Sequence, residues 1–260
     1  MDRIDLYELC VTDAPRTARF LHALHGRRGG VLREDFAGSG ALARAWAAAY
    51  GPAIAVDADA APLRRCAGLP RLRAVVADVR ACRRRADLIA ATNFPIGYWH
   101  TRRDLLAYLR HARRCLRPGG LFVCDTYGGS DAFTPGTATR RLRGPRGERI
   151  TYEFEQREAN AATGRVLNAL HFVVARAAPG AAGRAGPPRP RRYRDAFLYD
   201  WRLWSIPELR DAMDEAGFDS VEVHDRLGGA IDHTGALHTR PLGPDEPPDD
   251  PFVVYVAGRV

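Results

Sequence analysis

Short apolar segments alternate with amphipathic ones along most of this chain. The amphipathic segments 5–25, 41–50 and 101–116 carry apolar residues at helical spacing and predict helices. Alternating strands and helices indicate a parallel sheet with helices on both faces. The apolar segments predict buried strands at about 30–36, 53–57, 72–77, 86–92 and 119–126.

The pattern changes after residue 128. Three segments, 149–156, 166–174 and 193–201, alternate apolar and polar positions and predict antiparallel strands. Residues 160–164 supply a turn, and the Gly-, Ala-, Pro- and Arg-rich segment 179–192 predicts a mobile loop. A helix at 205–217 and strands at 219–225 and 252–259 then return to the first pattern. We therefore expect one domain from 1–128 and 205–260, interrupted by an antiparallel insertion at 129–204.

Two carboxylates precede a turn of small residues at the end of the first predicted strand. Segment 34–40 reads Glu-Asp-Phe-Ala-Gly-Ser-Gly and leads into a predicted helix, and the next strand ends on Asp57. Glycines let a backbone approach a nucleotide, and an acid after the second strand accepts hydrogen bonds from ribose hydroxyls. The pattern therefore predicts an adenosine site at the carboxyl ends of the strands.

Two classes of cofactor fit this turn. Residues 38–43 match the dinucleotide pattern G-x-G-x-x-A, which would make the chain an NAD-dependent oxidoreductase. A dinucleotide, however, places a diphosphate at the start of the helix. Glu34 and Asp35 would repel it by roughly 4 kcal/mol, for charges about 4 Å apart at an effective dielectric near 20. S-adenosylmethionine (SAM) has an adenosine, an ammonium and a sulfonium but no phosphate, so the two acids favour SAM.

On these residues the chain resembles the class I SAM-dependent methyltransferases, whose first motif is an acid followed by small residues ending in Gly-x-Gly. The resemblance implies an α/β fold: a doubly wound, seven-stranded, mostly parallel Rossmann-like sheet with an inserted antiparallel sheet. It also implies in-line transfer of a methyl group from SAM to nitrogen or oxygen of a small molecule. Later parts of the chain match in the family's order at Asp57, 75–78, 86–95, 116–125, 206–210 and 215–218.

The resemblance also implies site residues. Phe36 stands where many members of the family carry a glycine, and the insertion is expected to cover the substrate. The cofactor-binding residues are expected to be Glu34, Phe36, Ala37, Gly38, Gly40, Asp57, Ala58, Asp78, Val79, Asn93 and Phe94. Substrate contacts are expected from Tyr98, Trp99, Tyr127, Trp201 and Arg202. Candidates for positioning the acceptor or acting as a general base are His100, His171 and Tyr199.

Charge does not make nucleic acid the expected substrate. The net charge is +8, but all 39 basic residues are arginines, scattered along the chain as on solvated surfaces. Segment 93–96 reads Asn-Phe-Pro-Ile and lacks the aromatic platform of nucleic-acid amino-methyltransferases. An RNA or protein methyltransferase and a non-catalytic SAM-binding protein nevertheless remain alternatives.

The remaining composition adds few constraints. The five cysteines form no C-x-x-C pair, and no His, Cys and Asp spacing suggests a metal site, so we expect reduced, buried thiols and no metal. No apolar run approaches the roughly 18 residues needed to cross a bilayer. We expect a cytoplasmic monomer or homodimer that binds small molecules, with no membrane partner.

Overall fold

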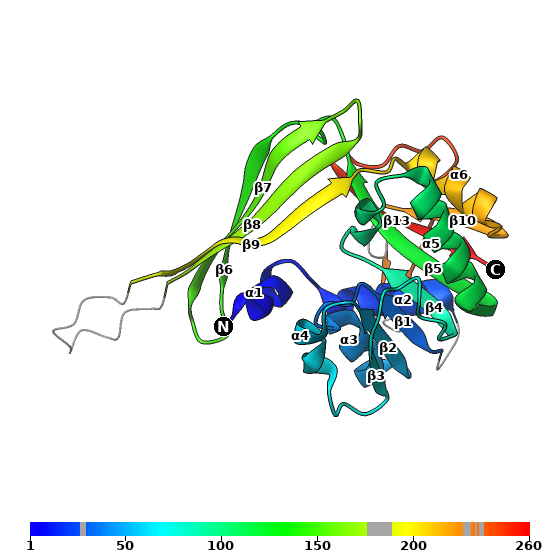
Figure 1. Cartoon of the computed structure of the whole chain (residues 1–260), viewed down its shortest axis with the longest axis horizontal. Helices are drawn as coiled ribbons and strands as arrows, with labels where there is room; N and C mark the ends of the chain where they lie inside the picture. The colour runs from blue at the N-terminus through cyan, green and yellow to red at the C-terminus, as the bar shows by residue number, and fades with distance from the viewer. Residues whose placement is uncertain (27–29, 176–188, 226–229, 232, 234–236) are drawn as a thin grey trace. The chain divides into compact units, whose positions relative to one another are not determined.

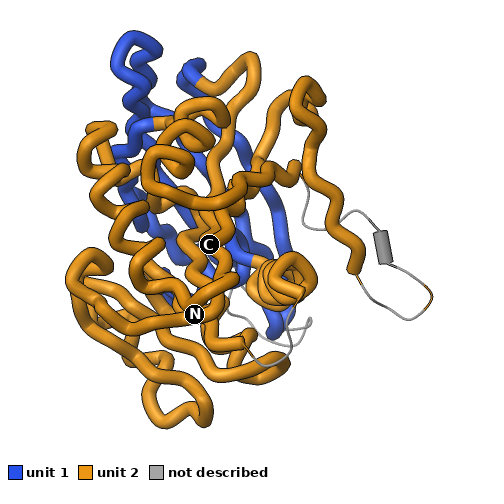
Figure 2. Tube along the Cα trace, turned by 90° about the vertical axis from the view of Figure 1, so that its right-hand side faces the viewer, with its two compact units in different colours: residues 1–12, 133–202 blue, residues 13–132, 203–260 orange. Residues whose placement is uncertain are grey.

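The computed structural model divides the chain into two compact units (Figure 2). The smaller unit contains residues 1–12 and 133–202, and the larger contains 13–132 and 203–260. The predicted boundaries differ from this division mainly in the first 12 residues, which belong to the smaller unit. The structure describes residues 1–26, 30–175, 189–225, 230–231, 233 and 237–260.

The larger unit is built on a seven-stranded sheet of order β10-β13-β5-β4-β1-β2-β3 (Figure 1). Strands β1 to β5 pair in parallel, whereas β13 is antiparallel to both of its neighbours. This confirms the predicted doubly wound, mostly parallel sheet. A separate pair joins β11 (Ala230–Ile231) and β12 (Leu237–His238). The sheet strands are β1 (Leu32–Asp35), β2 (Ala53–Asp57), β3 (Leu72–Val76), β4 (Ala86–Ala91), β5 (Leu116–Gly128), β10 (Ser220–His224) and β13 (Phe252–Arg259).

Helices cover both faces of this sheet because its central strands are apolar on both sides. In β4, Leu88 and Ala90 belong to the core shared with α2 and α3, and Ile89 and Ala91 belong to the core shared with α5 and α6. Such two-sided burial is typical of parallel sheets. The helices are α2 (Ala14–His25), α3 (Ala41–Ala49), α4 (Ala60–Leu63), α5 (Arg102–Cys115) and α6 (Ile206–Ala216), with single 3-10 turns η1 (Arg64–Cys66) and η2 (Pro95–Tyr98).

The smaller unit is a four-stranded antiparallel sheet of order β6-β7-β8-β9, with helix α1 (Arg3–Cys10) packed on it. Leu6 of α1 is fully buried in a cluster with Ile150, Leu170 and Phe172. The inserted antiparallel sheet is therefore confirmed. Its strands are β6 (Gly136–Arg143), β7 (Arg149–Asn160), β8 (Arg165–Ala175) and β9 (Arg191–Arg202).

Three expectations from the sequence need comment. The single helix predicted over 5–25 is wrong: α1 and α2 are separate, because Asp13 caps α2 by accepting a hydrogen bond from the Arg16 amide, with Pro15 in the first turn. Strand β6 was not predicted, since it lies at an exposed edge with little apolar alternation. Most of the loop predicted at 179–192 lies outside the described residues. Within those residues, no helix has the length and hydropathy needed to cross a membrane.

Candidate functional site

The predicted cofactor residues gather at the carboxyl ends of four adjacent strands. Strands β4, β1, β2 and β3 are consecutive in the sheet, so the segments that follow them lie in a row along one edge. All of the predicted residues are in the larger unit. From the strand order, the segments are 92–94 after β4, 34–40 at the end of β1, 57–58 at the end of β2 and 77–79 after β3.

The turn after β1 depends on left-handed backbone conformations. Phe36, Gly38 and Gly40 have φ of 57°, 53° and 68°. A Cβ on Gly40 would collide with the sulfur of Cys66, whereas a Cβ on Gly38 would meet no atom within 4 Å. Gly40 is therefore required for close packing, and the space over Gly38 is open.

The carboxyl groups of Asp57 and Glu34 accept hydrogen bonds from backbone amides in this turn and near it. The Gly38 amide donates to Asp57 Oδ2 (2.6 Å), and the Asp59 amide donates to Asp57 Oδ1 (2.8 Å). The Ala43 amide, in the first turn of α3, donates to Glu34 Oε2 (2.7 Å). Amides at the start of a helix are the groups that bind phosphate in nucleotide sites. Here Glu34 already accepts one of the amides at the start of α3, and Asp57 accepts an amide of the turn before it.

Glu34 is buried, with 6% of its surface exposed. Burial raises the pKa of Glu34 to about 8, although the hydrogen bond from the Ala43 amide works in the opposite direction. The carboxyl is therefore largely protonated at neutral pH when no cation lies beside it. A cationic ligand would favour the ionised form, so ligand charge and Glu34 ionisation are coupled.

Asp35 does not face the turn as a free charge. Arg33 Nε and Nη2 donate to its two oxygens at 2.6 and 3.0 Å, and the Tyr108 hydroxyl donates to Oδ2 at 3.0 Å. The Arg33 and Asp35 side chains are fully buried. The predicted repulsion from two acids is therefore wrong for Asp35, because the pair formed with Arg33 is neutral overall.

Arg33 also ties β1 to the segment after β3. Its guanidinium donates to the carbonyls of Val79 and Cys82, both at 2.9 Å. Asp78, predicted to face an adenine, forms an exposed ion pair with Arg80 (2.8 Å). The hydrogen bond from Arg80 lowers the pKa of Asp78, so this carboxylate stays ionised.

Aromatic rings surround the Phe36 side chain. Its ring centroid lies 6.1 Å from that of Tyr98, 5.9 Å from Trp99 and 5.7 Å from Tyr108. Arg80 lies over the Trp99 ring, 4.8 Å from its centroid. Two of the predicted substrate residues, Tyr98 and Trp99, thus lie beside the turn after β1. The ring contacts hold Phe36 in a left-handed backbone conformation that glycine adopts more readily.

The turn after β4 is bonded to Asp125 of β5, a residue that was not among the site residues expected from the sequence. The amides of Asn93 and Phe94 donate to the two oxygens of Asp125, at 2.8 and 2.7 Å. Asp125 is 3% exposed, and burial raises its pKa to about 7. Tyr127, a predicted substrate residue, packs edge-on against Phe94 at 5.0 Å. The available signal was an acid at the end of an apolar strand, as at Asp57.

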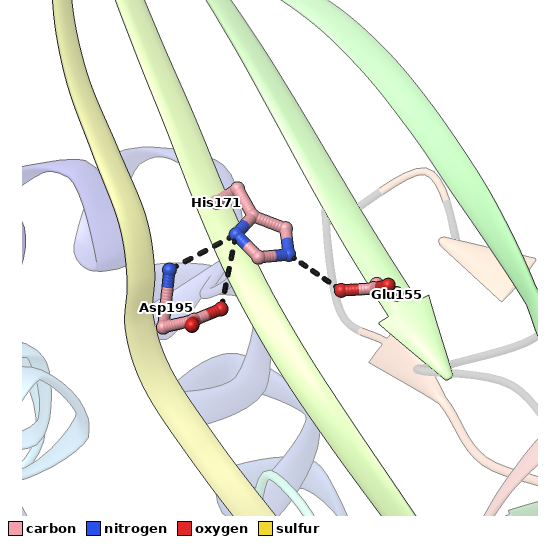
Figure 3. Close-up of side chains that lie close together, drawn as sticks. All are labelled: Glu155, His171 and Asp195. Carbon is pink, nitrogen blue, oxygen red and sulfur yellow. Dashed lines mark hydrogen bonds and ion pairs between the residues drawn. The ribbon is translucent and has the colours of Figure 1, made fainter. Parts of the chain in front are cut away.

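His171 lies in the smaller unit and is held by both ring nitrogens (Figure 3). The Asp195 amide donates to Nδ1 (3.0 Å), and Nε2 lies 2.9 Å from Glu155 Oε2. A neutral ring therefore carries its proton on Nε2 and donates it to Glu155. Asp195 has a positive φ of 49°, at a bulge where β9 passes His171. This arrangement leaves no free ring nitrogen to act as a base.

The same cluster has the spacing of a metal site but a different charge balance. Ligand atoms of Glu155, His171 and Asp195 lie within 4.8 Å of one another. Arg157 forms ion pairs with both carboxylates. Its guanidinium supplies the positive charge that a metal would bring.

The other predicted residues divide between the units. His100 is in the larger unit, and Tyr199, Trp201 and Arg202 are in the smaller one. The Tyr199 ring stacks on Trp201 (4.4 Å) and on Phe197 (6.3 Å) along one face of β9. The structure therefore brings together Tyr199 with Trp201, and Tyr98 with Trp99, within separate units.

Solved structures with this fold cover almost the whole chain. No protein-family model and no curated protein matches the sequence. An S-adenosylmethionine-dependent methyltransferase from Clostridium acetobutylicum has a TM-score of 0.69 at 14% identity, covering 99% of this chain and 97% of its own. DesVI from Streptomyces venezuelae has a TM-score of 0.70 at 17% identity, covering 99% and 98%.

A third structure is that of SAM-bound CalS10, an amino pentose methyltransferase from Micromonospora echinaspora. Its TM-score is 0.67 at 16% identity, with 99% of this chain and 95% of that chain covered. At such identities the likeness concerns the fold. The predicted Rossmann-like methyltransferase fold, including its inserted antiparallel sheet, is therefore confirmed.

Proposed function

We propose that this protein is a SAM-dependent methyltransferase that moves a methyl group to nitrogen or oxygen of a small molecule by in-line displacement. The observation that carries the proposal is the capping of the turn after β1. Asp57 and Glu34 accept the amides of Gly38 and Ala43, and they thereby place two carboxyl groups in the region where a diphosphate would bind. An adenosine cofactor without phosphate and with a cationic end suits this arrangement.

The residues present fit SAM. Each Asp57 oxygen accepts one described amide, and a carboxylate oxygen can accept a further bond, here from a ribose hydroxyl. Glu34 is the candidate partner for the ammonium, and the open space over Gly38 admits the cofactor. We assign the adenine to Ala58, Asp78 and Val79, and the methionine end to Phe36, Ala37, Gly40, Asn93 and Phe94.

SAM, when bound, supplies an activated methyl group on its sulfonium. The chain then has to align the acceptor and exclude water, and such positioning can contribute roughly 7–11 kcal/mol. Tyr98, Trp99 and Tyr127 are candidates for shielding the reaction and contacting the acceptor. A base is needed only for an acceptor that arrives protonated. The candidates for a base or positioning group are His100, His171 and Tyr199, of which His171 has both ring nitrogens engaged.

A small molecule is the proposed acceptor. The neighbours of known substrate include an amino pentose methyltransferase and a sugar N-methyltransferase, KedS8, at 16–17% identity. We assign the covering of the substrate to the insertion predicted at 129–204. In it, the Trp201 ring could hold an amine through cation–π attraction, and Arg202 could bind a carboxylate. The scattered arginines and the lack of an aromatic platform at 93–96 also disfavour nucleic acid as the acceptor.

Calorimetry with three ligands tests the cofactor. We expect binding of SAM and of S-adenosylhomocysteine, and no binding of NAD. Tight NAD binding without SAM binding would replace the proposal with an oxidoreductase. Turnover is then measured against amino sugars, amines, phenols and carboxylic acids, with RNA and a protein mixture as separate arms. SAM binding without a methylated product in any arm would indicate a non-catalytic SAM-binding protein.

A further inference from the structure

The turn after β4 has an unusual backbone. Asn93 and Phe94 are consecutive non-glycine residues in the left-handed region, with φ of 69° and 65°. Phe94 also precedes Pro95, and a residue before proline prefers extended conformations. Such a conformation is strained for most non-glycine residues, and it persists only where the surrounding structure imposes it.

Asp125 is the group that imposes it. Asp125 lies on β5, which pairs with β4, and its two oxygens accept the two consecutive amides of the turn separately. Hydrogen bonds to an ionised acceptor are stronger than those between neutral groups. The two bonds therefore oppose the strain of the turn.

The Asp125 carboxylate forms no ion pair with an arginine or histidine among the residues that the structure describes. Tyr255 lies opposite it on β13, and Cys124 precedes it. Burial raises the pKa of Cys124 and of Tyr255, with the Asp125 charge contributing, so both remain protonated at neutral pH. The amides of Phe94 and Asn93, together with the backbone amide of Asp125 itself, favour the ionised form of Asp125.

We propose that Asp125 is a positioning residue whose ionised carboxylate holds the turn at Asn93 and Phe94 in its left-handed form. The proposal deepens the proposed function and rests on it for its consequence: this turn is the one assigned to the methionine end of SAM. Asp125 does not touch the cofactor in this scheme. It acts through the two backbone amides.

The carboxyl is able to change state near neutral pH. A protonated carboxyl turns one oxygen into a donor, so it no longer accepts both amides equally well. With a pKa of about 7, Asp125 changes from mostly protonated to mostly ionised between pH 6 and pH 8. The turn should therefore be held less firmly at pH 6 than at pH 8.

Nuclear magnetic resonance of the free full-length protein tests the clamp without any ligand. We expect the amide protons of Asn93 and Phe94 to lie downfield and to titrate together between pH 5 and 9 with one midpoint. Asp125→Asn should remove that titration and increase hydrogen exchange at both amides. Amide resonances that do not respond to pH in the wild type would overturn the proposal, even where the variant fails to fold.

Binding of 5′-methylthioadenosine tests the consequence. This ligand has no ammonium, so Glu34 makes no charged contact with it, but it keeps the methylthio part of the methionine end to which the turn after β4 is assigned. We expect wild-type affinity to increase several-fold from pH 6 to pH 8, and Asp125→Asn to bind about fivefold more weakly at pH 8 without this pH dependence. Thr126→Val is the matched control. It removes a buried hydrogen bond to the Trp204 carbonyl (2.8 Å) from the next residue of β5.

The control should lose stability but keep its affinity within twofold. Equal weakening in both variants at equal loss of stability would reduce Asp125 to a structural residue and overturn the proposal. A wild type that shows the amide titration but binds neither SAM nor 5′-methylthioadenosine would refute the proposed function alone. The two failures are therefore distinguishable.

Discussion

Two turns at the same edge of the sheet are held by the same kind of bond but reach their shape differently. After β1, the Gly38 amide donates to Asp57, and glycines adopt positive φ without a steric cost. After β4, two non-glycine residues adopt it, and Asp125 takes both of their amides. The first turn has glycine at two of its three left-handed positions and ring contacts around the third, Phe36, whereas the second has no glycine and is bonded to its acid at both positions.

The two acids also differ in their burial. Asp57 is half-buried and each of its oxygens has capacity for a further hydrogen bond, so it is suited to bind a ligand directly. Asp125 is buried and occupied by the backbone. In this comparison the acid proposed to bind a ligand lies beside a turn with glycines, and the acid proposed to hold the backbone lies beside a turn without them.

Replacement of Asp57 should produce the largest effect. Asp57→Ala removes the proposed ribose acceptor and the partner of the Gly38 amide. The loss of two charge-assisted hydrogen bonds corresponds to a SAM affinity lower by on the order of 100-fold. Calorimetry measures the dissociation constant, and thermal unfolding checks that the domain remains folded. An unchanged dissociation constant would exclude Asp57 from the site.

A methyl group on Gly38 should have the next largest effect. Gly38→Ala places a Cβ in the open space over the turn, and we expect about tenfold weaker SAM binding. Gly68→Ala is the control, because Gly68 also has a positive φ (71°) and open surroundings. Both variants should lose roughly 1–2 kcal/mol of stability from the left-handed alanine. If both bind SAM equally well, the space over Gly38 is not the cofactor site.

The protonation of Glu34 should make SAM binding dependent on pH. In the free protein, burial raises the pKa of Glu34 to about 8. A cationic ligand lowers this pKa, so binding releases a proton and the affinity rises with pH. We expect about three- to tenfold tighter SAM binding at pH 7.0 than at pH 6.0, a range in which an α-amino group with a pKa of about 7.7–8.0 stays largely protonated. Glu34→Gln should reduce this slope. A slope unaltered by the substitution would assign it to other groups.

Making the second turn resemble the first should have the smallest effect. Asn93→Gly relieves the left-handed conformation but adds freedom to the unfolded chain, and asparagine already tolerates this region. We expect a change in unfolding free energy within about 1 kcal/mol, measured by urea denaturation. Destabilisation beyond about 2 kcal/mol would mean that the Asn93 side chain itself holds the turn. In the double variant, Asn93→Gly should also reduce the stability lost through Asp125→Asn.

Much of the fold was predictable because its signals are local. Apolar runs gave the parallel strands to within a few residues, and β13 has the predicted bounds at 252–259. Strand β6 was missed because an exposed edge strand pairs through its backbone and needs no apolar pattern. The break between α1 and α2 was missed although Asp13 and Pro15 form a helix start, since the apolar spacing continued across it.

The sequence by itself determined which residue types stand at each strand end, because strand, turn and helix signals depend on near neighbours. It placed Glu34, Asp57 and the glycines of the turn after β1 at one edge of a parallel sheet. Only the tertiary structure decided what each acid does there. Whether an acid pairs with an arginine, as Asp35 does, caps a helix, as Glu34 does, or holds a neighbouring turn, as Asp125 does, depends on groups distant in sequence. Burial and partner then set its charge, and neither can be read from the order of residues alone.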